Sequence, residues 1–129
     1  LDPDHVTLPV NPSATVDLPD LLVADLRDEP GWQLNMTVVG VQPTSASGAE
    51  PVFTVTPTSP RPIEGDTAGV RAAAPAPVRV GGCVVLATAD PGTGQGSYHV
   101  SATVNVQPPS TAPVDVEVVF SVVSSRTTP

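Results

Sequence analysis

Lysine is absent from this chain of 129 residues, and charged residues of all kinds make up only 14% of it. The five arginines are scattered along the sequence, and the formal net charge is −8. Surfaces that bind nucleic acid or anionic membranes carry clustered Lys and Arg, so the sequence argues against both partners. Without Lys, the chain also cannot form an intramolecular Lys–Asn isopeptide cross-link.

Long apolar runs and wall-anchoring motifs are missing as well. No stretch approaches the ~20 apolar residues of a membrane-spanning helix, so we expect no membrane insertion. No charged-then-apolar leader opens the sequence, and no Leu-Pro-x-Thr-Gly sorting motif with an apolar tail follows. We therefore expect that any signal peptide has been removed or never existed, and that attachment to a surface is non-covalent.

Residues that commonly carry catalysis or bind metals are few. The two histidines, His5 and His99, have no Cys and no second His at the spacing of a zinc site. The Gly-x-Ser-x-Gly motif of serine hydrolases and the His-Glu-x-x-His motif of metalloproteases do not occur. A Ser–His–Asp triad needs no local motif, but nothing marks one. We expect no catalytic residue, no metal and no cofactor, and hence no enzyme.

The chain has a single cysteine, Cys83, so it cannot form a disulfide within itself. Cys83 opens the apolar run Cys-Val-Val-Leu-Ala. A free Cys in such a run behaves as a small hydrophobic side chain, which predicts that Cys83 is buried. An intermolecular bridge or a reactive thiol is the alternative.

Two carboxylates, Asp115 and Glu117, lie on the same face of the last predicted strand. Such a pair can act as an acid and a base or can bind a cation. Outward charges also keep a Val-rich strand from pairing with neighbouring molecules, and we favour this simpler interpretation.

The abundant residues favour strands and turns. Val and Thr are frequent, and 17 Pro and 10 Gly interrupt them; β-branched residues favour strands, whereas Pro and Gly disfavour helices. The clearest strand covers residues 31–41, which hold the only Trp and the only Met. From Trp32 the side chains alternate between an apolar and a polar face, and this is the period of a half-buried strand.

The same reasoning locates the other strands. We expect residues 21–25 to form a hairpin with the Trp strand, and either a bulge or burial on both faces near Gly40. Residues 57–77 are predicted to be a long irregular loop. The expected strands cover residues 5–10, 21–25, 31–41, 52–56, 78–80, 83–89, 98–107 and 114–123.

These strands predict an all-β fold, a single-domain antiparallel β-sandwich of about 7–9 strands with an extended N-terminal edge strand or arm. A closed barrel is the less favoured alternative. Residues 1–19 form the edge strand or arm, residues 20–124 the sandwich, and residues 125–129 a polar tail. We expect the core to contain Trp32, Leu34, Met36, Phe53, Val85, Tyr98, Val104 and Phe120.

Two stretches resemble the WxL domains of Gram-positive cell-surface proteins. The first is Val23-Ala24-Asp25-Leu26-Arg27 with Pro30-Gly31-Trp32-Gln33-Leu34, which is similar to the family's strand, Asp and Arg pair, turn and Trp-x-Leu. The second is Gly94-Gln95-Gly96-Ser97-Tyr98, similar to the Gly-rich turn and aromatic that precede the family's last strands. Where the family repeats Trp-x-Leu, this chain has Phe120-Ser121-Val122. The resemblance implies a secreted, non-catalytic module that associates with peptidoglycan of the bacterial cell wall.

Two functional hypotheses follow. In the first, the chain is a module of the extracellular bacterial surface, bound non-covalently to peptidoglycan or structural there, with polar residues, exposed aromatics and residues 57–77 as its binding face. In the second, it is a subunit of a self-assembling filament or coat. Its arm, with Val6, Leu8 and Val10 on one side, would then complete the sheet of an identical subunit. A carbohydrate-binding module is discouraged by the scarcity of aromatics, which are 3% of the residues.

Overall fold

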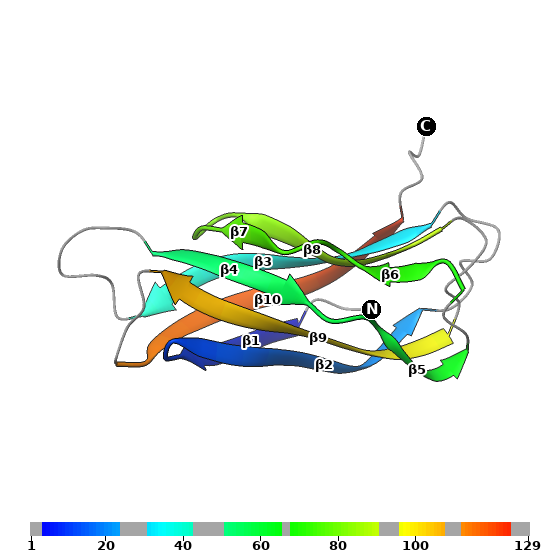
Figure 1. The fold of residues 1–129 in the computed structure, drawn as a ribbon, viewed down its shortest axis with the longest axis horizontal. Helices are drawn as coiled ribbons and strands as arrows, with labels where there is room; N and C mark the ends of the chain where they lie inside the picture. The colour runs from blue at the N-terminus through cyan, green and yellow to red at the C-terminus, as the bar shows by residue number, and fades with distance from the viewer. Residues whose placement is uncertain are drawn as a thin grey trace.

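The computed structural model describes residues 4–23, 31–42, 51–65, 68–90, 96–107 and 112–124. Within these ranges the chain forms β-strands and no helix (Figure 1). None of the described residues therefore belongs to a helix long and apolar enough to cross a membrane. The strands are β1 (Asp4–Val10), β2 (Ser13–Val23), β3 (Trp32–Gln42), β4 (Val52–Pro57), β5 (Arg61–Gly65), β6 (Val70–Ala72), β7 (Ala76–Val78), β8 (Cys83–Ala89), β9 (Gly96–Gln107) and β10 (Val114–Ser124).

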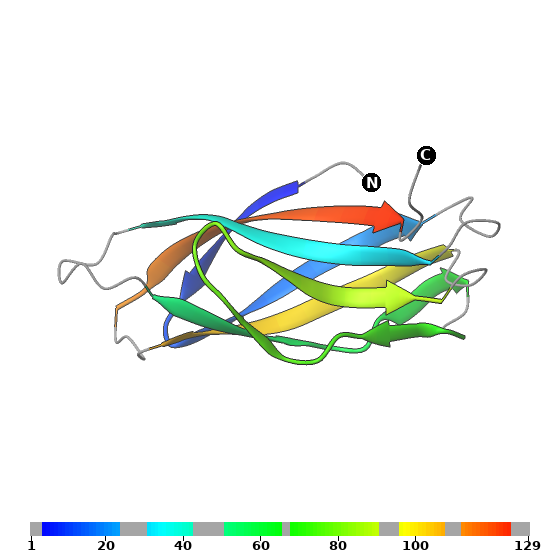
Figure 2. The same ribbon diagram turned by 90° about the horizontal axis from the view of Figure 1, so that it is seen from above.

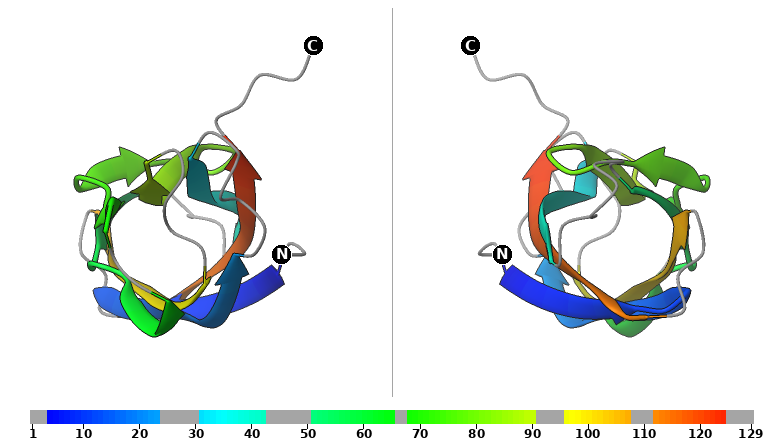
Figure 3. Two further views of the ribbon diagram at one scale, coloured as in Figure 1. Left: turned by 90° about the vertical axis from the view of Figure 1, so that its right-hand side faces the viewer. Right: turned by 90° about the vertical axis from the view of Figure 1, so that its left-hand side faces the viewer.

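The strands form two antiparallel sheets that face each other across one core. Sheet A has the order β1-β10-β3-β8-β6, and sheet B has the order β2-β9-β4-β7, with β5 also paired to β9. Viewed along the strands, the two sheets curve around a common interior (Figure 3). The predicted all-β sandwich, with an N-terminal edge strand, is confirmed, although the described residues form ten strands rather than the expected seven to nine.

Side chains that alternate along the long strands fill this interior. On β9, Tyr98, Val100, Ala102, Val104 and Val106 are buried and the intervening residues are not. All four aromatic side chains of the chain are at most 1% exposed, and no polar or charged side chain is buried among the described residues. Of the residues expected in the core, the structure buries Trp32, Leu34, Met36, Phe53, Tyr98, Val104 and Phe120.

A β-bulge interrupts β3 at Val39. Against β10, Val38 is opposite Val118 and Gly40 is opposite Glu117, so Val39 is an extra residue in the ladder. The extra residue shifts the alternation of inward and outward side chains along β3 by one position, and Val39 itself is 42% exposed. The bulge was one of the two alternatives expected near Gly40, and the structure confirms it.

The expectation that Cys83 and Val85 are buried is wrong. Cys83 is exposed, and Val85 lies half-buried on the outer face of sheet A. A register shift of β8 against β3 places Leu86 and Ala87 inward one after the other. Because the run of residues 83–87 is apolar at every position, the sequence alone does not show which residues point inward.

The expected hairpin between residues 21–25 and the Trp strand is also wrong. The strand that ends at Val23 begins at Ser13 and pairs with β9 in sheet B, whereas Trp32 opens β3 in sheet A. The strand also crosses the boundary expected between residues 19 and 20. Residues 24 and 25 of the expected strand lie outside the described ranges.

Residues 57–77, expected to be an irregular loop, contain three short strands instead. β5 pairs with β9, β6 with β8 and β7 with β4, so the segment passes from sheet B to sheet A and back (Figure 2). These strands have only three to five residues each, which is too short for alternation to be recognised. Pro62 in β5 and Pro77 in β7 also argue against strands at the sequence level, because Pro is tolerated in a sheet mainly at its edges.

Candidate functional site

The candidate assembly arm forms β1 and lies along β10 of the same chain. Seven residue pairs join the two strands, from Asp4 opposite Phe120 to Val10 opposite Val114. Leu8 and Val10 are buried, and Val6 is partly buried against the core. In this chain β1 therefore completes sheet A as its edge strand.

The outer face of sheet B carries a group of hydroxyl and amide side chains on three adjacent strands. We call this group the hydroxyl face. Each member alternates along its strand with buried apolar residues such as Val16, Phe53 and Val104. Its members are Ser13 and Thr15 of β2, Ser101, Thr103 and Asn105 of β9, and Thr54 and Thr56 of β4.

The strand register arranges the hydroxyl face in rows. Thr15, Thr103 and Thr56 form one row across the three strands, and Ser13, Asn105 and Thr54 form the next. Neighbouring strands lie about 4.7–4.9 Å apart, and rows on one face repeat about every 6.8 Å. Asp17 of β2 is exposed on the same outer face, directly opposite Ser101, so one charge lies at the end of the hydroxyl face, whose seven members are themselves uncharged. The result is an uncharged array of hydrogen-bonding groups with a regular spacing.

The chemistry of these side chains suits a ligand rich in hydroxyl and amide groups. Ser and Thr hydroxyls both donate and accept hydrogen bonds, and an Asn amide does the same with its two ends. Thr is stiff at χ1 because it is branched at Cβ, so little side-chain freedom is lost when it binds. Sugars with N-acetyl groups and peptide backbones present complementary donors and acceptors.

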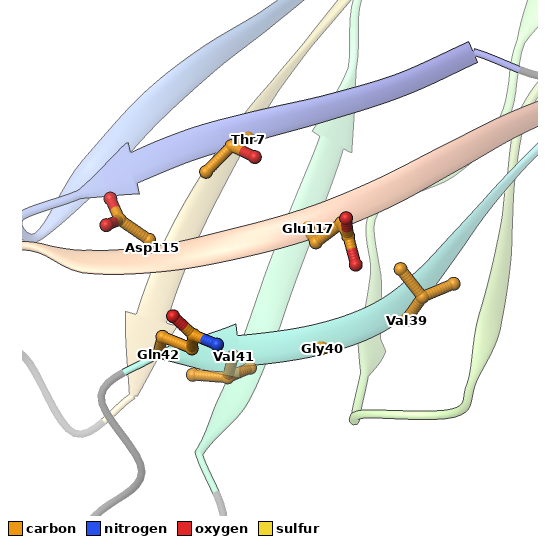
Figure 4. Close-up of a pocket in the computed structure, with 7 residues that line it drawn as sticks. All are labelled: Thr7, Val39, Gly40, Val41, Gln42, Asp115 and Glu117. Carbon is orange, nitrogen blue, oxygen red and sulfur yellow. The ribbon is translucent and has the colours of Figure 1, made fainter.

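A hollow of about 410 Å³ opens on the outer face of sheet A (Figure 4). The bulge at Val39 and the missing side chain of Gly40 help to shape it. A Cβ placed on Gly40 would lie 3.8 Å from Glu117 Oε1, so this carboxylate reaches over the glycine. The lining residues are Thr7 of β1, Val39, Gly40, Val41 and Gln42 of β3, and Asp115 and Glu117 of β10.

Asp115 and Glu117 are both exposed and lie on the same face of β10, as the sequence predicts. Two residues apart on a strand, their Cα atoms are separated by about 7 Å. Within the described ranges, no three Asp, Glu, His or Cys side chains come together as a metal site would require. The interpretation that these charges keep the last strand from pairing does not hold, because β10 is paired on both sides, with β1 and with β3.

The binding face expected from the sequence is only partly where it was predicted. Exposed aromatics take no part in it, because the chain has only four aromatic residues and all are buried. Residues 57–77 contribute β5 and β7 to sheet B, but β6 lies in sheet A, where Arg71 forms an ion pair with Asp90. His99 is half-buried on β9 opposite Arg61 of β5.

The hydroxyl face was not predicted as a site. The sequence predicts a strand at residues 98–107 but none at residues 13–20, because residues 1–19 are expected to form the edge strand or arm. Which strands lie side by side depends on pairing between residues far apart in sequence. A local alternation of Ser and Thr with Val, as in Ser13–Val16, is the signal that was available.

No protein-family model, no curated protein and no solved structure matches this chain.

Proposed function

We propose that this chain is a non-catalytic module of the bacterial cell surface. It is secreted and is held non-covalently on the peptidoglycan of the cell wall through its hydroxyl face. The observation that supports this proposal is the arrangement of three Thr residues, Thr15, Thr103 and Thr56, in one row across adjacent strands of sheet B. The resemblance of the Trp32 and Tyr98 segments to WxL domains points to the same polymer.

The free energies of hydrogen bonding and of association indicate how tightly such a face binds. Each hydrogen bond contributes about 0.5–1.5 kcal/mol net, so the seven side chains of the hydroxyl face together contribute about 4–10 kcal/mol. The loss of translational and rotational freedom on association costs about 4–15 kcal/mol. A short soluble fragment that reaches only part of the face therefore binds weakly, whereas a polymer strand long enough to meet all seven side chains binds more tightly.

Co-sedimentation with purified peptidoglycan sacculi tests the proposal. We expect the chain to pellet with the sacculi and to stay bound when the salt concentration is raised, because the hydroxyl face is uncharged and salt screens only charge. Soluble peptidoglycan fragments should compete poorly. A chain that stays in the supernatant, or that is released by moderate salt, would contradict binding through this face.

A further inference from the structure

β1 is held by the rest of the molecule along one side only. It is an edge strand of sheet A, and its only partner strand in the described part of that sheet is β10. Leu8 and Val10 are 6% and 0% exposed, and Val6 packs partly against the core. The forces that hold β1 are thus one ladder of hydrogen bonds and three apolar side chains.

The link between β1 and β2 is only two residues long. Asn11 and Pro12 join β1 of sheet A to β2 of sheet B, so the chain reverses direction between the sheets at this point (Figure 2). Pro fixes its own φ near −65°, and it disfavours the helical region for the residue before it. In this chain the Asn11–Pro12 peptide bond is cis and the link turns the chain back, whereas the extended backbone that these residues favour suits a straight connection.

We propose that two copies of this chain exchange β1, so that the β1 of each copy lies on the β10 of the other. The antiparallel register and the burial of Leu8 and Val10 are then the same as within one chain. The link straightens, and β1 continues into β2 along residues 4–23. The partner is a second copy because β1 carries the side chains that fit the inner face of β10, opposite Val116 and Val118.

Exchange leaves no β10 edge open in either copy, which is the condition for a closed two-fold assembly. Since the contacts between β1 and β10 are the same in both states, the balance between one chain and two depends on the protein concentration and on the link, whose Pro12 carbonyl accepts a hydrogen bond from Val106 N–H in the single chain. Short links between exchangeable elements favour exchange. The two copies each carry a charge of −8, so salt, which screens their repulsion, should raise the exchanged fraction. This proposal does not depend on wall binding.

A cross-link between chains tests the exchange. In a background with Cys83→Ser, one variant carries Thr7→Cys and a second carries Glu117→Cys; these residues lie opposite each other on β1 and β10 and are both exposed. Residues directly opposite on antiparallel strands have Cβ atoms about 4.5–5.5 Å apart, which is close to disulfide distance. We expect the mixed variants to form a disulfide-linked heterodimer when they are incubated together at high concentration and oxidised.

Two controls make the result decisive. The double variant Thr7→Cys with Glu117→Cys should close within one chain, which shows that the pair can form the bond. A mixture of Thr7→Cys with Thr56→Cys, whose residues lie on different sheets, measures cross-linking by chance collision. If the Thr7 and Glu117 variants link no faster than this mixture while the double variant closes, the exchange is contradicted.

A change in the link gives an independent readout. Six Gly and Ser residues inserted between Asn11 and Pro12 let β1 fold back on its own chain without strain, so the heterodimer yield should fall several-fold while the melting temperature changes little. An unchanged yield would overturn the role of the link and with it the proposal. Larger assemblies that carry the same cross-link support exchange equally, because a copy can pass β1 onward instead of back; electron microscopy would then show fibres.

Discussion

The rings of Trp32 and Tyr98 lie with their centroids 6.1 Å apart and their planes tilted by 48°. Trp32 belongs to β3 of sheet A and Tyr98 to β9 of sheet B, so this contact joins the two sheets. Both side chains are at most 1% exposed. Tilted aromatic pairs at this distance contribute about 0.5–1.5 kcal/mol beyond the apolar area that they bury. The single Trp of the chain is therefore the centre of the contact between the layers.

Replacing Trp32 by Ala should lower the free energy of unfolding by about 3–5 kcal/mol, the usual cost of removing a large buried aromatic. Since small domains are stable by only about 5–15 kcal/mol, much of the variant should be unfolded at modest urea concentrations. The exposed Val123→Ala is the matched control, which should change stability by less than about 0.5 kcal/mol. Equal urea midpoints for the two variants would contradict a core centred on Trp32.

Gly31, which precedes Trp32, should not tolerate a side chain. A Cβ at this position would lie 1.6 Å from the carbonyl oxygen of Ala89, a backbone atom at the end of β8. Gly31→Ala must therefore push β3 and β8 apart, and we expect a loss of several kcal/mol, similar to overpacking or more. In Gly40→Ala the nearest atom is 3.8 Å away, so that variant should melt within a few degrees of the native chain. A Gly31→Ala variant that melts together with Gly40→Ala would contradict the close approach.

The bulge predicts an unusual tolerance to deletion. Removing Val39 places Val38 and Gly40 next to each other, opposite Val118 and Glu117, and so restores a regular ladder in which every neighbour keeps its face. Removing Thr103, which lies in a regular part of β9 with no bulge nearby, turns all residues on one side of the deletion to the wrong face. We expect the chain without Val39 to fold and melt cooperatively, and the chain without Thr103 to be unfolded, as circular dichroism would measure. Comparable behaviour of the two deletions would argue against the bulge.

Long, regular strands were predictable because their alternation is a local property. On β9 and β10 a single period of two extends over many residues, and the structure follows it from Tyr98 to Val106 and from Val114 to Phe120. The same reading failed at Val85 because a register shift against β3 interrupts the alternation. Such a shift depends on the neighbouring strand, which the sequence of β8 does not contain.

Strand pairing was the part of the fold that local patterns could not supply. A hairpin between residues 21–25 and the Trp strand is expected because the two are neighbours in sequence, whereas β2, which contains residues 21–23, pairs with β9, some 80 residues away in the chain. The hydroxyl face was missed for the same reason, since its rows join Thr15, Thr103 and Thr56 from three distant segments. β5, β6 and β7 were missed because each has only three to five residues, and β5 and β7 also contain Pro.

The central claim, that the hydroxyl face binds peptidoglycan, is tested most directly by removing its hydroxyls without changing shape or charge. The double variant Thr15→Val, Thr56→Val removes two of these hydroxyls on sheet B. The double variant Thr7→Val, Thr37→Val is the matched change on the outer face of sheet A. The measurement is the fraction of each folded variant that pellets with purified sacculi. We predict that the fraction bound to sacculi is several-fold lower for the sheet B variant than for the native chain, and that it is unchanged for the sheet A variant. Native binding by both variants, or equal loss by both, would contradict the claim.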